Sequence, residues 1–153
     1  MHAGSLGDKL DYEQYHTEVH EWGSVQIGIA KDGEPAFDLP KGHPDYGKQI
    51  AGYYFWLFPN LMLNFYLWGI SVNIVQPIGP TTTRIIYQSY VSDASKLGEG
   101  AGSNLYRIEM EDEEIVESAQ KGVRSRLYDR GRYSPSREKG PHHFHRLLAS
   151  FLG

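Results

Sequence analysis

Apolar and polar residues alternate with a period of two along much of the first part of the chain. Such alternation is typical of β-strands that bury one face. Residues 12–22 alternate in this way, and residues 24–29 follow as a hairpin partner, with the turn near Gly23. Residues 61–68 and 83–91 show the same period. The pattern therefore predicts consecutive antiparallel strands.

The stretch from residue 49 to residue 83 contains no charged residue, which raises the question of a membrane span. Pro59 and Asn60 interrupt it, however, and polar residues continue to appear beyond them. Alternating strands fit this stretch better than a membrane helix, so we expect no contact with a membrane. Asn64 and Asn73 would then either point into a cavity or be ordinary hydrogen-bonded polar groups within the sheet.

We expect a loop at residues 31–47, between the strands, long enough to be a lid or an edge over a pocket. Helical periodicity appears only after the strands. A helix is predicted from residue 111 to about residue 126, and a last helix over residues 142–151. The apolar stripe of the first helix would be Ile115, Ala119, Gly122 and Val123, and that of the second Phe144, Leu147, Leu148 and Phe151. Strands followed by helices indicate an α+β domain.

Composition narrows the class of protein. The 153 residues suffice for one domain, and the net charge of −4 gives no electrostatic reason to bind nucleic acid. The absence of cysteine excludes disulfides, cysteine nucleophiles and cysteine-ligated clusters within this chain. No signal peptide is recognisable before Asp8, so the cytoplasm is the expected location.

The acidic stretch Glu109–Glu117 is the most unusual chemical feature. Acidic residues are common in the first turn of a helix, where the macrodipole favours negative charge. The other interpretation is a metal site, because a carboxylate among other carboxylates is costly to ionise without a cation. Composition alone favours the helix start.

Two stretches carry a more specific signal. Residues 54–66 read Tyr-Phe-Trp-Leu-Phe-Pro-Asn-Leu-Met-Leu-Asn-Phe-Tyr. Residues 111–122 read Glu-Asp-Glu-Glu-Ile-Val-Glu-Ser-Ala-Gln-Lys-Gly, and Gly-Arg-Tyr-Ser-Pro at 131–135 and His-His-Phe-His-Arg-Leu at 142–147 follow. Together they resemble the C-terminal catalytic domain of Rieske non-haem iron ring-hydroxylating oxygenase alpha subunits, in the branch with choline and carnitine monooxygenases. The resemblance extends from about residue 12 to residue 148.

The resemblance implies a helix-grip fold of the START/Bet v 1 type, an antiparallel sheet with C-terminal helices around a substrate cavity. It implies a mononuclear Fe(II) held by two histidines and one carboxylate, with open positions for dioxygen. A Rieske 2Fe-2S cluster on an N-terminal domain, usually of a neighbouring subunit in a trimer, would deliver electrons from a ferredoxin or reductase. The reaction would be monooxygenation or dioxygenation of an aromatic compound, or hydroxylation or demethylation of a quaternary amine.

Residue by residue, Asp112 matches the carboxylate ligand of the family. His2 matches the second histidine of the family motif, and the first would lie upstream of Met1. The alternative is that His2 is simply a terminal residue. Because a Rieske cluster needs cysteines that this chain lacks, residues 1–153 are expected to be a partial catalytic domain without its Rieske domain. The chain alone is expected to bind iron weakly and to be inactive.

Substrate residues are harder to assign. Trp56, Asn64, Tyr66 and Asn73 are our candidates for the cavity, where aromatic rings could face an aromatic substrate or a trimethylammonium group. Most of the aromatic residues could equally be sheet core. His142 and His145 could form a metal-binding face, but we interpret them as a packing feature. A helix-grip binding module without catalysis remains the alternative function, and Asp112 with its flanking motif argues against it.

Overall fold

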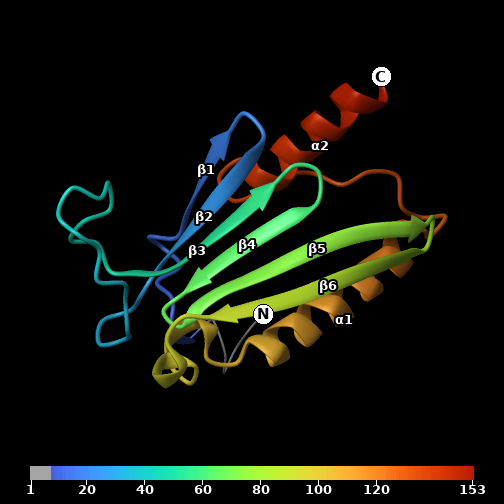
Figure 1. Ribbon diagram of the computed structural model, residues 1–153. Coiled ribbons are helices and arrows are strands. Elements are labelled where there is room, and N and C mark those ends of the chain that lie inside the picture. The colour runs from blue at the N-terminus through green and yellow to red at the C-terminus, as the bar shows by residue number, and fades with distance from the viewer. Residues whose placement is uncertain (1–7) are drawn as a thin grey trace.

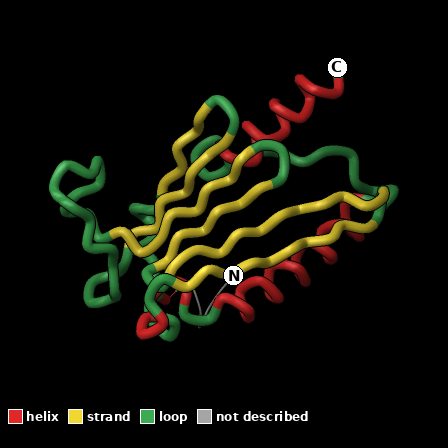
Figure 2. Tube along the Cα trace, viewed as in Figure 1, coloured by secondary structure: helices red, strands yellow, loops and turns green. Residues whose placement is uncertain are grey.

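A computed structural model describes residues 8–153, in which one antiparallel sheet carries two helices on the same side (Figure 1). The sheet has six strands arranged in the order of the sequence, each paired with the next (Figure 2). The strands are β1 (His16–His20), β2 (Gly23–Ile29), β3 (Ile50–Leu57), β4 (Leu61–Tyr66), β5 (Gly69–Gly79) and β6 (Thr82–Val91). Two short 3-10 helices follow, η2 (Ala94–Lys96) and η3 (Gly100–Gly102), before α1 (Leu105–Val123) and α2 (Lys139–Leu152). The predicted α+β order, strands first and helices last, is confirmed.

The pairing register decides which side chains share a face of the sheet. Trp56 pairs with Met62, Met62 with Asn73, and Asn73 with Tyr87. Directly opposed residues in an antiparallel sheet point to the same side. The helices contact this side, since Gly140 of α2 lies against Ser24 and α1 reaches Tyr87. We call it the inner face; its members include Ser24, Gln26, Tyr54, Trp56, Met62, Asn64, Tyr66, Ser71, Asn73, Val75, Ile85 and Tyr87.

The long loop between β2 and β3 covers the opposite, outer face. Its Phe37 and Leu39 pack against a buried cluster formed by Val25, Ile27, Ile29 and Ile50. Asp45 fixes the loop, because it accepts hydrogen bonds from Lys48 Nζ at 2.6 Å and from the Tyr53 hydroxyl at 2.8 Å. The loop is therefore not a lid over the inner face. It does form one edge of a pocket, described below.

The first helix begins earlier than the acidic run suggested. α1 starts at Leu105 rather than at residue 111, and its first turn contains no acidic residue. The acidic residues thus lie in the middle of the helix, where the macrodipole does not stabilise them. The predicted apolar stripe is also wrong in part, because Ile115 and Val123 are 41% and 45% exposed while Ile108 is the buried residue.

The second helix extends from Lys139 to Leu152, close to its predicted range. Phe144 packs edge-on against Trp56 of β3, with ring centroids 5.0 Å apart. Phe151 stacks on Phe58 at 4.9 Å but stays 62% exposed. The predicted apolar side of this helix does face the sheet near its start and becomes more open towards its end. Within residues 8–153, neither helix has the length and apolar character needed to cross a membrane.

Candidate functional site

A clamp at one end of the sheet positions α1 over the inner face. Tyr66 and Trp68 stack with ring centroids 5.3 Å apart, and the Trp68 indole Nε1 donates a hydrogen bond to the Gly102 carbonyl at 3.2 Å. A Cβ atom at Gly102 would lie 2.4 Å from Trp68 Nε1 and 2.7 Å from Tyr66 Cγ. The backbone just before α1 is therefore in direct contact with two buried rings, which sets where the helix begins.

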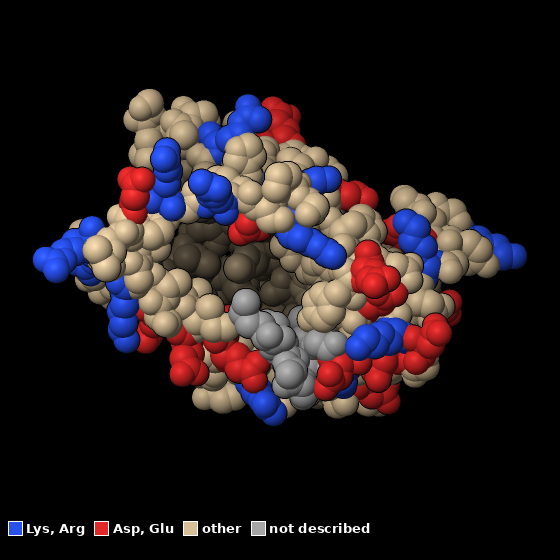
Figure 3. All heavy atoms as spheres, turned by 180° about the vertical axis from the view of Figure 1, so that it is seen from behind, with Lys and Arg blue, Asp and Glu red and all other residues tan. Residues whose placement is uncertain are grey.

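A cavity of about 850 Å³ lies between α1 and strands β4 to β6. Figure 3 views the side that carries the helices and shows the surface hollowed between them. Residues three or four apart on a helix share one side, and α1 presents its acidic residues here in that spacing. Among the lining residues are Met62, Asn73, Val75, Ile85, Tyr87, Glu109, Asp112, Glu113, Val116, Glu117, Gln120 and Lys121.

The helix side of the cavity is strongly negative. Four acidic residues of α1 line it: Glu109, Asp112, Glu113 and Glu117. Lys121 is the one basic residue among the lining residues. Burial, followed by the charges of Glu113 and Asp112, raises the pKa of the Glu109 carboxyl to about 7. Its Oε1 atom is buried and has no hydrogen-bond partner within residues 8–153. An uncompensated carboxylate of this kind favours a cation beside it.

The sheet side adds hydroxyl and amide groups. The Tyr87 hydroxyl donates a hydrogen bond to Glu113 Oε1 at 3.2 Å. Burial and the charge of Glu113 raise the pKa of Tyr87, so this hydroxyl stays protonated and remains a donor. Asn73, which also lines the cavity, accepts a hydrogen bond from the Ser71 hydroxyl at 2.8 Å through its Oδ1.

The residues predicted from sequence fall into three groups. Asp112 and Asn73 line the cavity on opposite sides. Trp56, Asn64 and Tyr66 share the inner face but are not among the lining residues; Trp56 packs on α2, and Tyr66 is 6% exposed in the clamp. His2 lies outside the described residues. The assignment of all of these to iron or substrate stays a prediction.

Sequence reasoning missed Tyr87, and it did not single out Glu109 or Glu113. Tyr87 belongs to the site because it pairs with Asn73 across β5 and β6, and that register is not visible in the alternation alone. Glu109 and Glu113 lie three residues before and one residue after Asp112. Helical spacing from Asp112 would have pointed to Glu109, and spacing from Glu109 to Glu113.

The cavity offers part of a metal site. Carboxylate oxygens suit a divalent cation, and Glu109 Oε1 is a buried acceptor without a partner in the described chain. Within residues 8–153, however, no three His, Cys, Asp or Glu side chains are grouped so as to hold a metal ion. The described chain therefore fits the carboxylate side of an iron site and does not supply its histidines.

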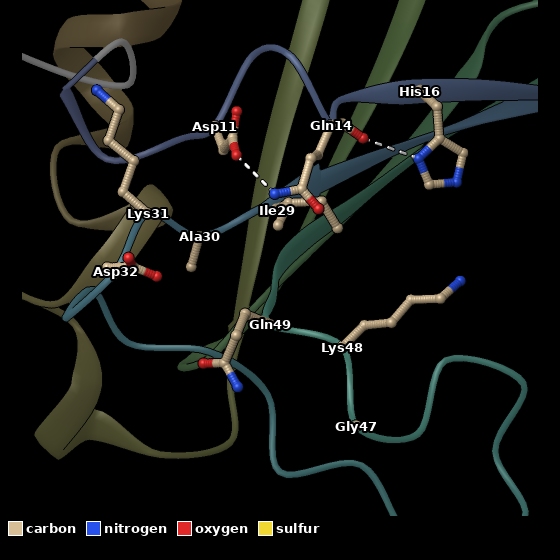
Figure 4. A pocket seen from close by; sticks show the side chains of 10 residues that line it. All are labelled: Asp11, Gln14, His16, Ile29, Ala30, Lys31, Asp32, Gly47, Lys48 and Gln49. Carbon is tan, nitrogen blue, oxygen red and sulfur yellow. Dashed lines mark hydrogen bonds between the residues drawn. The ribbon is translucent and has the colours of Figure 1, made fainter.

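A second pocket, of about 780 Å³, lies away from α1. It is lined by the β2–β3 loop, by Asp11 and Gln14 of the segment before β1, and by His16 at the start of β1. Its Lys31 and Lys48 side chains point away from each other (Figure 4), and Lys48 is paired with Asp45 at 2.6 Å. Polar groups do not converge there as they do beside α1.

The histidines of α2 form another cluster of possible ligands. The Tyr133 hydroxyl contacts His145 Nδ1, and the Tyr133 ring packs edge-on against His142 at 5.1 Å between centroids. This aromatic contact ties the coil before α2 to the helix. It agrees with the interpretation of these histidines as a packing feature.

The chain is similar to known proteins over almost its whole length. The family model described as "Ring hydroxylating alpha subunit (catalytic domain)" matches residues 10–153. The chloroplastic choline monooxygenase of Arabidopsis thaliana is 34% identical over an alignment of 153 positions, which covers 96% of this chain and 34% of that protein. The carnitine monooxygenase oxygenase subunit of Escherichia coli K12 is 32% identical over an alignment of 160 positions, which covers 97% of this chain and 41% of that protein.

Solved structures agree on the fold. A quaternary ammonium Rieske monooxygenase, studied for carnitine oxidation and inter-subunit electron transfer, superposes with a TM-score of 0.72 at 24% identity. The match covers 98% of this chain and 42% of that one. The chain thus spans about a third to two fifths of the length of the proteins it matches.

Proposed function

The chain belongs to the family of ring-hydroxylating oxygenase alpha subunits, whose catalytic-domain model covers residues 10–153, and we propose that it is part of a Rieske monooxygenase that oxidises a small quaternary amine. By family it is an oxidoreductase. Its relatives are named as choline and carnitine monooxygenases, and choline and carnitine are both trimethylammonium compounds. The negative cavity beside α1 supports a cationic substrate over a neutral aromatic ring.

Asp112 carries the proposal. The resemblance matches it to the carboxylate ligand of the family, and it lines the cavity between α1 and the sheet. When bound there, a mononuclear Fe(II) with open positions supplies the activation of dioxygen. Asp112 contributes a carboxylate oxygen from a helix whose start is fixed by the Tyr66–Trp68 clamp. Glu113 and Tyr87 hold each other in place between α1 and β6.

We further propose that electrons reach this domain from a Rieske 2Fe-2S cluster outside these residues, since the chain has no cysteine for one. A ferredoxin or reductase would be the donor, and an oligomer would bring cluster and iron together. The structural relative studied for inter-subunit electron transfer supports this arrangement.

Iron binding by the 153-residue chain tests the role of Asp112. The chain is titrated with Fe(II) without oxygen, and the retained iron is measured by mass spectrometry. We expect weak binding that Asp112→Ala reduces at least tenfold, because the substitution removes a ligand. His2→Ala is expected to act in the same direction. Glu114→Ala is the matched control, since Glu114 is an exposed acidic residue of α1 that does not line the cavity.

If the Asp112→Ala chain retains as much iron as the unaltered chain, the proposal is wrong. The alternative, a helix-grip binding module without catalysis, has one observation in its favour: no grouping of three metal ligands exists within residues 8–153. That alternative predicts no specific iron binding in any of these chains.

A further inference from the structure

An apolar patch lies on the surface where the end of α2 meets the turns at one end of the sheet. The Trp22 ring packs edge-on against Phe151 with centroids 6.0 Å apart, and Phe151 stacks on Phe58. Trp22 and Phe151 are nevertheless 51% and 62% exposed, and the neighbouring Leu152 is exposed as well. We call these four residues the apolar patch. Apolar side chains gathered at the surface in this way indicate contact with another molecule.

A basic turn follows α1 and presents a single apolar side chain. Leu127 is 89% exposed, and its N–H donates a hydrogen bond to Ser125 Oγ at 3.2 Å, so the turn has a defined shape. Arg124 and Arg126 lie on either side of Ser125 and form no ion pair within residues 8–153. We call residues 124–128 the basic turn. An exposed leucine beside unpaired arginines suits an apolar surface bordered by acidic groups.

The apolar patch and the basic turn belong to segments of opposite charge. Residues 10–30, which contain Trp22, include four acidic residues and no lysine or arginine. Residues 121–139 include seven lysines and arginines and two acidic residues. Glu21 is exposed next to Trp22 and has no ion-pair partner in the described part of the chain. The two surfaces are therefore complementary in charge, which steers two surfaces together and fixes their orientation.

These two surfaces of one chain lie apart. In Figure 1 the coil that leaves α1 turns at the side of the sheet formed by β5 and β6, whereas the β1–β2 turn lies at the other side. A contact between the basic turn and the apolar patch therefore joins two copies of the chain. Because it uses a different surface on each copy, the contact is head-to-tail and repeats from one copy to the next.

We propose that the basic turn of one copy docks on the apolar patch of a second copy. Leu127 of the first copy packs against the Trp22 and Phe151 rings of the second, and Arg126 pairs with Glu21. Tryptophan and arginine are the residues that most often dominate the energy of such contacts. The inference goes beyond the proposed function, because the contact requires neither iron nor substrate.

A mixing experiment with the 153-residue chain tests this contact by sedimentation velocity. Phe151→Ser alters the apolar patch and Leu127→Ser the basic turn, and circular dichroism verifies that each variant is folded. We expect the unaltered chain to associate and each variant alone to remain monomeric at the same concentration. An equimolar mixture of the two variants should form a one-to-one dimer, because one supplies an intact basic turn and the other an intact apolar patch. Tyr106→Ser, which removes an exposed ring of α1, is the matched control and should leave association unchanged.

The mixture separates this contact from every other mode of association. If the unaltered chain associates and the mixture stays monomeric, another surface joins the copies and the proposal is wrong. It is equally wrong if the unaltered chain is monomeric at every soluble concentration, or if Leu127→Ser associates as the unaltered chain does.

An exchange of charges tests the pairing of Arg126 with Glu21. Arg126→Glu and Glu21→Arg should each weaken association about tenfold, since each places like charges opposite one another. Both substitutions in one chain should restore it, because the opposite charges then face each other again. A doubly substituted chain as weak as the single variants contradicts the proposed orientation.

Discussion

Glu109 and Asp112 lie three residues apart on α1 and line the same cavity, yet they differ in burial. Glu109 is half-buried with one oxygen unpaired in the described chain, whereas Asp112 is exposed. Burial, followed by the charges of Glu113 and Asp112, raises the pKa of the Glu109 carboxyl from an ordinary 4.5 to about 7. The fold therefore opposes the ionisation of Glu109.

This difference predicts a pH effect on stability in the metal-free chain. A carboxyl whose pKa is raised by folding favours the folded state fully below pH 4.5, and this contribution is lost as the pH rises through 7. The side chain that Glu109→Gln introduces cannot ionise. The melting temperature of this variant, relative to that of the unaltered chain, should therefore rise as the pH increases from 5 to 8. Thermal denaturation with a chelator present measures this. A constant difference between the two chains across that range would contradict the burial of the Glu109 carboxyl.

The sequence allowed only part of the site to be predicted at the residue scale. Asp112 was found through a motif, and Asn73 through its polarity within an apolar strand. Tyr87 depends on the pairing of β5 with β6, which alternation does not specify. Trp56 was a cavity candidate because it is aromatic, but its ring packs on Phe144 of a helix distant in sequence.

At the scale of elements, the position of α1 depends on tertiary contacts more than on its own sequence. Its acidic residues do not lie at the start, so no macrodipole effect holds them there. Leu105 packs instead against the cluster that contains Tyr66, Trp68 and Ala101. This is why the sequence pattern placed the helix start at residue 111: the contacts that fix the true start come from β4 and η3.

Gly102→Ala tests the clamp. The added Cβ would lie 2.4 Å from Trp68 Nε1 and 2.7 Å from Tyr66 Cγ, both in rigid rings, so something must shift. We expect a loss of about 1–3 kcal/mol in the free energy of unfolding, typical of overpacking. Urea denaturation followed by tryptophan fluorescence measures it.

Gly122→Ala is the matched control, because Gly122 lies within α1 and a Cβ atom added there would meet no neighbouring atom within 4 Å. That substitution should stabilise the chain by about 0.5–1 kcal/mol through helix propensity. If both substitutions have the same effect, the clamp does not constrain the backbone at Gly102.

At the scale of the whole molecule, the order of strands and helices was predictable and the use of the two faces was not. Alternation in β4 and β5 places apolar residues on both sides, so the pattern alone did not identify the inner face. The register and the packing of α2 on Ser24 and Trp56 settle it. The β2–β3 loop, a possible lid by its length, covers the outer face instead.

The chain spans about a third to two fifths of the length of the proteins it matches, and the proposed function leads to a prediction about turnover. Because the chain has no cysteine to bind a Rieske cluster, it should not convert choline when supplied with iron, oxygen, a reductase and reduced nicotinamide cofactor. Product analysis by mass spectrometry checks this. Product that disappears in Asp112→Ala would contradict the expected need for a separate cluster.

The location of iron on the chain is the most direct test of the role proposed for Asp112. Crystals grown without oxygen and soaked in Fe(II) are measured at the iron absorption edge, and the anomalous signal is mapped. We predict one peak in the cavity between α1 and the sheet, bonded to a carboxylate oxygen of Asp112. A peak at the α2 histidines, or no peak beside Asp112, would contradict the assignment.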